Sequence, residues 1–397
     1  MTKNGRMWLS DITLVLADRV LRRGSLRIEA GRIAEIVDRP MPGGVTGPGL
    51  TVFPGFIDMH GDMIELELEP RARVDFPMEV ALASLDARLA AAGVTTAYAA
   101  VSFSHGAVDG ERRSCEHTNK VIRELHDLRR TCRVDHRIHA RFDITFDNAV
   151  AVLGKLLDDG HVDLVSLMDH TPGQGQYRNI EAHIKAKAAE YGISETEARQ
   201  KVTTTIATRS RPQEVLMRNM TAVSRMCADH GVSLASHDDD TVEKARMMAD
   251  LGARIAEFPV TMQAAQIAAE RGLMTAMGAP NAMRGQSYSG NLSARDLHAA
   301  GLLHILASDY HPGAILAAVR ALANNDRAGL AGAVRLASCN PARALGLTDR
   351  GELRPGKRAD LFVTDANDRV ILTLCAGEIV HHNGTLDLTA ATAPAIA

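Results

Sequence analysis

The segment PGFIDMHGD, residues 54–62, joins a run of apolar residues to a group of ionisable side chains. The apolar part is typical of a buried strand, which we expect over VFPGFID, residues 52–58. Extended backbone projects alternate side chains to the same side, so His60 and Asp62 can reach one cation. The segment therefore predicts a strand that ends in a pair of metal ligands.

Further apolar runs follow this strand, and each is succeeded by a stretch with helical spacing. In the first helix, Leu82, Leu85 and Leu89 fall on one face, and Gly93 ends it. This alternation is typical of βα units around a parallel sheet, and eight units indicate a (β/α)₈ TIM barrel, of the α/β class, over residues 53–349. The predicted strands are 52–58, 94–103, 138–144, 162–168, 232–236, 255–258, 273–277 and 303–308.

Both ends of the chain are rich in short strands separated by turns. The N-terminal part contains DITLVLAD and SLRIEAGRIAEIVDR, and the C-terminal part contains ADLFVTD and RVILTLCAGEIVHHNG. Neither end has enough strands for a stable sheet by itself. We therefore expect one small β-sandwich domain, built from residues 1–52 and 350–397 together, with the barrel inserted between them.

The fourth connection of the barrel is too long for a simple crossover between strands. It covers about 171–230 and contains charged helical sequence such as IEAHIKAKAAEYGISETEARQ. We expect a helical insertion over the mouth of the barrel. A long solvated pair of helices is the alternative.

The composition is that of an ordinary globular protein, with 46% hydrophobic and 23% charged residues among 397. The net charge of -3 lacks the basic excess of nucleic-acid-binding proteins, so no nucleic acid partner is expected. The five cysteines form no CxxC pair, which favours a reducing compartment. No segment has the pattern of a signal peptide or a membrane span, so we expect a cytoplasmic protein without a membrane partner. The sequence leaves open whether the protein is a homo-oligomer.

Ionisable residues gather at the predicted carboxyl ends of the strands, where barrel enzymes place their chemistry. Imidazole and carboxylate groups together suit Zn²⁺, Mn²⁺ or Fe²⁺, and an oxygen-rich set suits Mg²⁺; zinc is the first expectation. There are more candidates than the four ligands of a closed structural site, which favours one or two divalent metal ions with a position open for water. The candidate ligands are His60, Asp62, Asp143, His237, Glu257 and Asp309.

Several longer motifs resemble the amidohydrolase superfamily. They are PGFIDMHGD at 54–62, His237 on the fifth strand, LASDYHP at 306–312 and the tail SCNPARALGLTDRGELRPGKRADLFVTD at 338–365. The tail is specific because its Asn-Pro, Gly and Ala-Asp positions occur together. The resemblance spans nearly the whole chain and implies a metal-dependent (β/α)₈ barrel with a small β-sandwich formed by both termini.

The sequence departs from the commonest superfamily pattern in three places. The first motif is His-x-Asp where His-x-His is usual, the sixth strand offers Glu257 where a histidine is common, and the fourth strand has no obvious bridging lysine. These departures disfavour a deaminase or a dihydroorotase. The stretches IDMHGDMIE, SLMDHTPGQGQY, SHDDDT, EFPVT, MGAPNAMRGQSYSGNLSARDL and ILASDYHP resemble instead the branch that acts in phosphonate metabolism, in the carbon-phosphorus lyase pathway.

Resemblance to that branch implies a hydrolase that acts on a small phosphorylated sugar. The implied reaction is hydrolysis of α-D-ribose 1-methylphosphonate 5-triphosphate to the 5-phosphate and pyrophosphate. It also implies that Asp309 holds the attacking water and accepts its proton, and that the other candidate ligands complete the metal cage, with Asp143 as a bridging carboxylate. Glu257 is alternatively an anchor for His237.

The loops after the fourth, seventh and eighth strands supply candidates for substrate binding. Backbone flanked by glycine can approach phosphate oxygens, and an arginine can make a bidentate contact with them. The role of His170 stays open between metal ligand, phosphate donor and general acid. The candidates are His170, Tyr177, Arg178, Asn281, Arg284 and His311.

Two other functions stay open at this point. The same metal cage serves an amidohydrolase that cleaves a C–N bond in an N-acyl or cyclic amide, although a neutral amide needs fewer converging cationic groups than a triphosphate. A barrel that has lost its metal would act as an assembly component instead. The presence of His60, Asp62, His237 and Asp309 argues against that last function.

Overall fold

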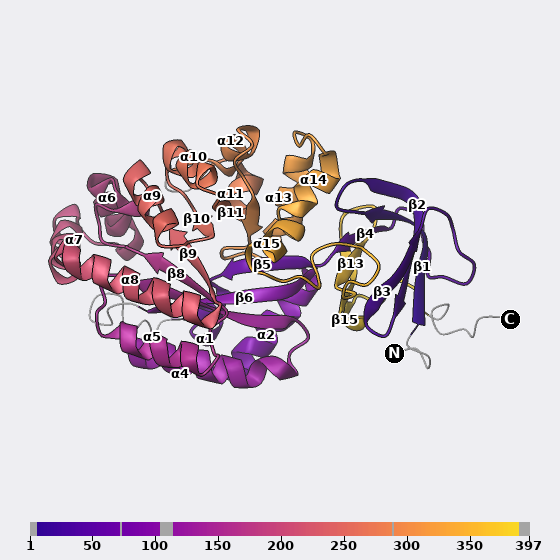
Figure 1. Ribbon diagram of the computed structural model, residues 1–397, viewed down its shortest axis with the longest axis horizontal. Coiled ribbons are helices and arrows are strands. Elements are labelled where there is room, and N and C mark those ends of the chain that lie inside the picture. The colour runs from indigo at the N-terminus through magenta and orange to yellow at the C-terminus, as the bar shows by residue number, and fades with distance from the viewer. Residues whose placement is uncertain (1–5, 72–73, 104–113, 288–289, 389–397) are drawn as a thin grey trace.

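The computed structural model describes residues 6–71, 74–103, 114–287 and 290–388. An eight-stranded barrel lies at the centre of the molecule, and a seven-stranded sheet lies at one end (Figure 1). The outermost parts of the predicted terminal domain, 1–5 and 389–397, lie outside the described residues.

The barrel strands follow one another in chain order, and each is parallel to its neighbours. A parallel bridge between Gly61 and Asp309 joins the first strand to the segment after the last one. The predicted barrel is thereby confirmed. The strands are β5 (Phe56–Gly61), β6 (Val94–Phe103), β7 (Asp135–Asp143), β8 (Leu164–Met168), β9 (Ser233–His237), β10 (Ile255–Glu257), β11 (Met274–Gly278) and β12 (Ile305–Ala307).

Helices follow every barrel strand, as the spacing of apolar residues predicts. On α2, Leu82, Leu85 and Leu89 are all buried against the barrel core. The helices are α1 (Met63–Leu68), α2 (Met78–Ala91), α4 (Cys115–Leu128), α5 (Ala149–Asp158), α6 (Ile180–Tyr191), α7 (Glu195–Arg209), α8 (Gln213–His230), α9 (Val242–Asp250), α10 (Met262–Glu270), α11 (Ala279–Arg284), α12 (Ala294–Ala299), α13 (Ala314–Ala323), α14 (Gly329–Arg335) and α15 (Cys339–Ala344), with 3₁₀ turns η2 (Arg129–Thr131) and η3 (Gly175–Tyr177).

The second sheet combines strands from both ends of the chain in the order β15-β14-β13-β4-β1-β2-β3. Its neighbours are antiparallel except for β1 and β4, which are parallel. Its buried side chains form a hydrophobic cluster of their own, which includes Leu14, Leu26 and Leu361. A terminal β-domain built jointly from both ends is confirmed. Its strands are β1 (Arg6–Val15), β2 (Val20–Glu29), β3 (Arg32–Val37), β4 (Thr51–Pro54), β13 (Leu361–Thr364), β14 (Val370–Cys375) and β15 (Glu378–His382).

The strand predicted over 52–58 is two strands rather than one. Residues up to Pro54 pair with β1 and β13 in the terminal sheet, whereas residues from Phe56 onward pair with β6 in the barrel. Gly55 lies between them, and a Cβ atom there would lie 2.2 Å from Thr95 Oγ1. The chain therefore changes sheets at the one residue whose missing side chain allows this close approach.

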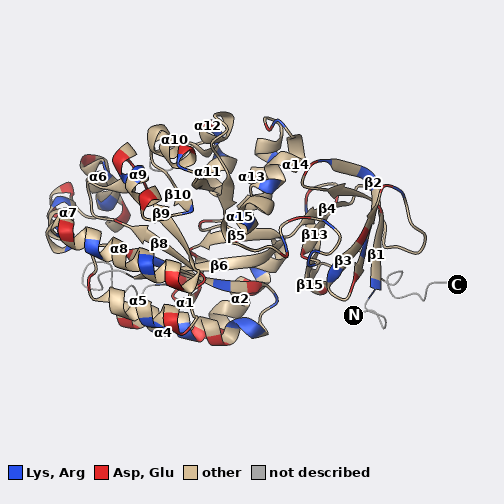
Figure 2. Cartoon of the chain, viewed as in Figure 1, with Lys and Arg blue, Asp and Glu red and all other residues tan. Residues whose placement is uncertain are grey.

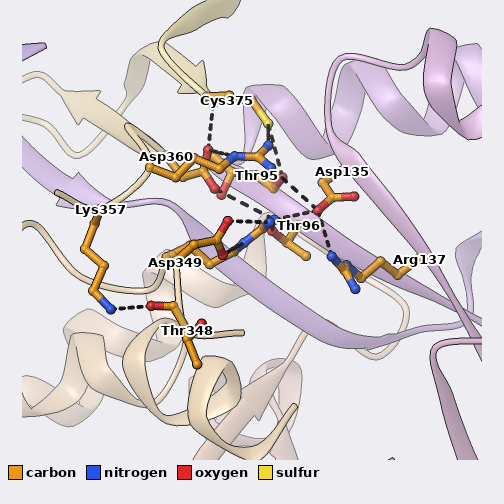
Figure 3. A network of polar contacts seen from close by, with 12 residues as sticks. Thr95, Thr96, Asp135, Arg137, Thr348, Asp349, Lys357, Asp360 and Cys375 are labelled. Carbon is orange, nitrogen blue, oxygen red and sulfur yellow. Dashed lines mark hydrogen bonds and ion pairs between the residues drawn. The ribbon is translucent and has the colours of Figure 1, made fainter. Parts of the chain in front are cut away.

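Aromatic and charged contacts join the terminal sheet to the barrel. Phe362 stacks on Phe53 within the terminal sheet, at 4.9 Å between ring centroids, and meets Phe56 of the barrel edge-on at 4.7 Å. Figure 3 shows the polar part of this junction, which lies around Asp135, Asp349 and Asp360. Because Asp135 is the first residue of β7, this network lies at the amino end of the strands, away from the predicted chemistry.

Two helices in the long fourth connection pack mainly on each other. Ile184 and Ala188 of α6 form a small hydrophobic cluster with Ala198 and Val202 of α7. In contrast, α8 contributes residues such as Val223 to the main barrel core. We call α6 and α7 together the helical hairpin; it lies at the opposite end of the molecule from the terminal sheet (Figure 1).

The outer helices carry charges of both signs, as Figure 2 shows for α4, α7 and α8. Within the described part of the chain, every helix is too short or too polar to cross a membrane.

Candidate metal centre and active site

Barrel closure brings the first and last sequence motifs together. The backbone N–H of Asp309 donates to the carbonyl of His60 at 2.9 Å, and that of Asp62 donates to the carbonyl of Asp309 at 2.7 Å. Buried Asp58 accepts a hydrogen bond from the backbone N–H of Ser308 at 2.8 Å. The residues around His60 and those around Asp309, far apart in the sequence, thus form one side of a shared site.

Three buried side chains from different strands form the centre of this site. The ligand atoms of His60, His237 and Glu257 all lie within 4.8 Å of one another. His60 Nδ1 lies 3.3 Å from Glu257 Oε2, and the rings of His60 and His237 are 5.4 Å apart. The arrangement provides two imidazole nitrogens and a carboxylate in one small volume.

The hydrogen bonding of this group fits a divalent cation. Within the described part of the chain, both carboxylate oxygens of Glu257, both ring nitrogens of His237 and Nδ1 of His60 are buried and make no hydrogen bond. Such groups are costly to leave unsatisfied in a folded protein. Coordination to a metal ion would satisfy them, so the residues present fit the ion that the sequence predicts.

The charges at the centre favour a cation too. Burial by itself lowers the pKa of His60, but the charges of Glu257 and Asp62 outweigh it and raise the pKa to about 10. Burial lowers the pKa of His237 to about 3, which keeps that ring in the neutral form that binds metals. The negative charges of Glu257 and Asp62 therefore stabilise a positive charge at the centre, where His237 is a neutral ligand.

Asp62 and Asp309 flank the centre on the seam of the barrel. Asp62 Oδ1 lies 3.4 Å from His60 Nε2 and accepts a hydrogen bond of 2.8 Å from buried Arg141. Burial and the negative charge of Asp62 raise the pKa of Asp309 to about 6. A carboxylate with such a pKa is a better proton acceptor near neutral pH than an ordinary aspartate.

The backbone is strained at three of the strand ends that form the site. Asp238, Phe258 and Asp309 follow directly after or close to the ends of β9, β10 and β12, and their φ angles are 55°, 52° and 60°. Residues other than glycine adopt this left-handed region at an energetic cost, and such residues cluster at active sites. The ring of Phe258 lies 4.9 Å from that of His60 and 5.3 Å from that of His237.

His170 extends the site toward the hairpin. Its Nε2 lies 3.4 Å from Asp238 Oδ2, and Asp238 Oδ2 lies 3.1 Å from His237 Nδ1. The ligand atoms of His170, His237 and Asp238 form a second group within 4.8 Å. This group shares His237 with the centre. The site therefore has enough ligand atoms to hold a second ion.

Asp143 is held by a different set of partners. Its Oδ2 accepts a 2.8 Å hydrogen bond from Arg209 of α7, and its Oδ1 accepts from the backbone N–H and the hydroxyl of Thr145 at 3.0 and 2.6 Å. The carboxylate predicted to bridge metals is therefore engaged in fixing the hairpin to the end of β7.

His139 also lies at the centre, as an uncharged neighbour. Its Nε2 is 2.9 Å from Ser166 Oγ and 3.7 Å from Glu257 Oε1. Burial lowers its pKa to about 3, so the ring is neutral. It limits the space around Glu257 without adding charge.

A cleft of about 2390 Å³ opens beside the centre. His170, Tyr177 and Arg209 line it, together with the inner faces of the hairpin and parts of α1, α2 and α4. A substrate much larger than the metal group has room here.

The predicted site residues differ in where they lie. The structure brings His60, Asp62, His237, Glu257 and Asp309 together, and places His170 and Tyr177 on the adjoining cleft. The side chains of Arg178, Arg284 and His311 are exposed. Asn281 donates to the carbonyl of Leu292 at 3.1 Å and accepts from the backbone N–H of Ala294 at 3.0 Å, which fixes the loop after α11.

Sequence reasoning missed Arg209 as a partner of the site. It lies 66 positions after Asp143 in an inserted helix, so no local spacing connects the two residues. It also missed His183, Lys187 and Tyr191, which line the cleft. Their spacing of four residues along one helix was a signal that could have found them.

Comparison with known proteins agrees with this architecture. The model of the amidohydrolase family matches residues 51–380. A curated relative from Escherichia coli (strain K12), α-D-ribose 1-methylphosphonate 5-triphosphate diphosphatase, is 35% identical over 371 residues, which cover 92% of this chain and 97% of the relative.

Solved structures with low sequence identity share the fold. A variant of N-acetyl-D-glucosamine-6-phosphate deacetylase from Mycobacterium smegmatis superposes with a TM-score of 0.64 at 17% identity, covering 95% of this chain and 99% of that one. A triazine hydrolase variant superposes with a TM-score of 0.61 at 15% identity, covering 96% and 97% of the two chains. Because the family model matches most of this chain, the chain belongs to the amidohydrolase family and is a hydrolase.

Proposed function

We propose that this protein hydrolyses α-D-ribose 1-methylphosphonate 5-triphosphate to the 5-phosphate and pyrophosphate, and that it requires a divalent metal, with zinc as the first candidate. The observation that carries the proposal is the 35% identity to the E. coli diphosphatase over 92% of this chain. The buried, unsatisfied donor set of His60, His237 and Glu257 supports the metal requirement.

The metal ligands in this proposal are His60, His237 and Glu257, with Asp62 and Asp309 beside them. A bound divalent cation makes water more acidic and polarises a phosphoryl oxygen. Arg141 donates to Asp62 Oδ1, the oxygen that lies 3.4 Å from His60 Nε2, and so fixes this carboxylate beside the centre. Asp143 lies outside the proposed cage because Arg209 and Thr145 occupy its oxygens.

Asp309 acts as the general base in this mechanism. Water attacks the phosphorus nearest the ribose, its proton passes to a carboxylate oxygen of Asp309, and the bond from that phosphorus to the next bridging oxygen breaks. Pyrophosphate leaves with the electron pair of that bond. His170 lies on the cleft side of His237 and is placed to donate a hydrogen bond to a phosphate oxygen.

We place the reaction in the cytoplasm. All five cysteines are free in the structure, as expected in a reducing compartment.

The decisive assay offers the metal-loaded protein a panel of ribose and nucleoside triphosphates together with N-acyl and cyclic amides. We expect pyrophosphate release from the phosphonate-bearing triphosphate, and we expect Asp309→Asn to lower kcat by about 10²- to 10⁴-fold, the usual contribution of a general base. Release of an amine without pyrophosphate would favour cleavage of a C–N bond. A protein that binds no divalent metal would favour the non-catalytic role.

A further inference from the structure

A line of polar side chains leads from the metal centre along the hairpin wall of the cleft. The ring of His170 lies 5.4 Å from that of His237, and the ring of Tyr177 lies 5.9 Å from that of His170. Tyr177 is in turn 4.3 Å from the ring of His183 on α6. Successive contacts thus connect the candidate ligands to the helical hairpin.

The line continues on one face of α6. His183, Lys187 and Tyr191 are spaced by four residues, so they project from the same side of the helix, and all three line the cleft. Lys187 Nζ lies 3.2 Å from Tyr191 Oη and 4.8 Å from the centre of its ring. Lys201 of α7 lies over the same ring at 5.5 Å and also lines the cleft.

Two ammonium groups therefore flank one aromatic ring. Lys187 pairs with Glu190 at 3.2 Å, whereas Lys201 makes no ion pair with any residue that the structure describes. Burial by itself lowers the pKa of Lys187, but the hydrogen bond to Tyr191 outweighs it and raises the pKa, so the lysine stays charged. The two positive charges near the ring of Tyr191 create a local potential that attracts an anion.

Both walls of the cleft carry charges of both signs: Glu190 and Glu197 lie beside the lysines on the hairpin side, and Lys120 lies among the carboxylates of the opposite wall. Asp75 and Glu79 lie on that wall, before and at the start of α2, and Asp127 lies near the end of α4. Among the described lining residues, carboxylates outnumber lysines on the opposite wall but not on the hairpin side. Because carboxylates repel a phosphate group, an anionic ligand in the cleft is favoured on the hairpin side.

We propose that His183, Lys187 and Lys201 bind a phosphate or phosphonate group of the substrate that lies away from the reacting phosphorus. This inference rests on the proposed function, in which the substrate is anionic at both ends. The bound group is either the terminal phosphate of the triphosphate, which leaves within pyrophosphate, or the methylphosphonate on the far side of the ribose. Contacts to a remote, non-reacting group contribute substrate affinity, and their loss raises KM more than it lowers kcat.

The test compares Lys187→Gln and Lys201→Gln with Lys185→Gln. Lys185→Gln removes the same charge from α6. Lys185 is exposed and is absent from the described residues that line the cleft. Binding of inorganic pyrophosphate and of methylphosphonate to the metal-loaded protein is measured by calorimetry, and kcat and KM are measured with the triphosphate. We expect Lys187→Gln to weaken binding of one of the two anions and to raise KM, each by about tenfold, as for a lost charge-assisted hydrogen bond.

The affected anion identifies which end of the substrate the hairpin holds. Equal Kd and KM values for Lys187→Gln, Lys201→Gln and Lys185→Gln would overturn the inference while leaving turnover of the triphosphate intact. If the wild-type protein released no pyrophosphate from any triphosphate, the proposed function would fail instead, so the two failures are distinguishable.

Discussion

At the scale of single residues, Glu257 is buried at the end of β10, and neither of its oxygens hydrogen-bonds to a described residue. Its position opposite His60 and His237 is explained if it is a metal ligand rather than a structural carboxylate. The alternative from the sequence, an anchor for His237, requires a hydrogen bond that the structure does not show among the described residues.

We expect Glu257→Gln to weaken metal binding by at least about tenfold, because the change removes a charged oxygen from the cage. Metal content of the purified variant, measured by mass spectrometry, and titration of the apoprotein with Zn²⁺ test this expectation. Glu243→Gln, a change of the same kind on the exposed first turn of α9, is the control and keeps its metal. Full metal content in Glu257→Gln would remove this residue from the cage.

At the scale of elements, a buried ion pair joins the hairpin to the end of β7. The side chains of Arg209 and Asp143 are 3% and 0% exposed. Arg199 and Glu181 make a similar pair within the hairpin, at 2.7 Å, but their side chains are 51% and 63% exposed. The two pairs therefore have the same chemistry and differ in solvation.

Arg209→Met is expected to destabilise the protein by about 3–5 kcal/mol, because it leaves Asp143 buried without its cation. Arg199→Met should cost less than about 1 kcal/mol, as exposed pairs do. Urea unfolding gives the two values, and hydrogen exchange shows whether α7 loosens first. Similar midpoints for the two variants would show that the buried pair does not fix the hairpin.

A second element-scale contact, between α2 and the start of β7, gives a pH dependence. Burial by itself raises the pKa of Asp86, but hydrogen bonds from His136 at 3.0 Å and from the backbone N–H groups of Arg133 and Val134, each at 3.0 Å, outweigh it. The pKa therefore lies below the ordinary value of 3.8.

A carboxyl group whose pKa is lowered by folding stabilises the native state above its unfolded pKa, and that contribution is lost as pH falls through the folded value. We expect the free energy of unfolding to fall as the pH drops below about 4, and Asp86→Asn to show a shallower fall over the same range. Urea midpoints across a pH series measure both slopes, with the exposed Asp18→Asn as control. Parallel curves for wild type and Asp86→Asn would contradict this account.

At the scale of the whole molecule, Arg350 connects the barrel to the terminal sheet, because it pairs with Asp135 at the start of β7 and with Asp360 just before β13. Figure 3 shows these two aspartates within one polar network. The side chain of Arg350 is 5% exposed and donates to Thr96 Oγ1 at 3.0 Å and to Asp349 at 2.9 Å. The segment after α15 is thereby attached to the end of the barrel opposite the metal centre.

We expect Arg350→Met to lower stability by about 3–5 kcal/mol, because Asp135 and Asp349 lose a largely buried partner. Since the network is remote from Asp309 and His237, kcat should stay within about twofold of wild type below the unfolding transition. Arg354→Met removes an arginine whose side chain is 60% exposed and should change little. A large loss of kcat in folded Arg350→Met would show that the junction acts on the site.

Three features could be predicted from the chain alone: the barrel, the terminal β-domain and the kinds of side chain at the strand ends. These features follow from local patterns, because alternation and helical spacing are properties of neighbouring residues. Leu82, Leu85 and Leu89 predict α2 in this way, and PGFIDMHGD predicts both a strand and its ligands.

Which of those side chains meet depends on how the elements pack in three dimensions. Closure of the barrel brings Asp309 against His60, the hairpin brings Arg209 to Asp143, and close approach of β6 at Gly55 divides one predicted strand between two sheets. Conversely, Arg178 and Arg284 were predicted to bind substrate from their positions in the loops, but their side chains are exposed. Contacts between residues tens or hundreds of positions apart depend on how whole elements pack, and no local spacing in the chain records them.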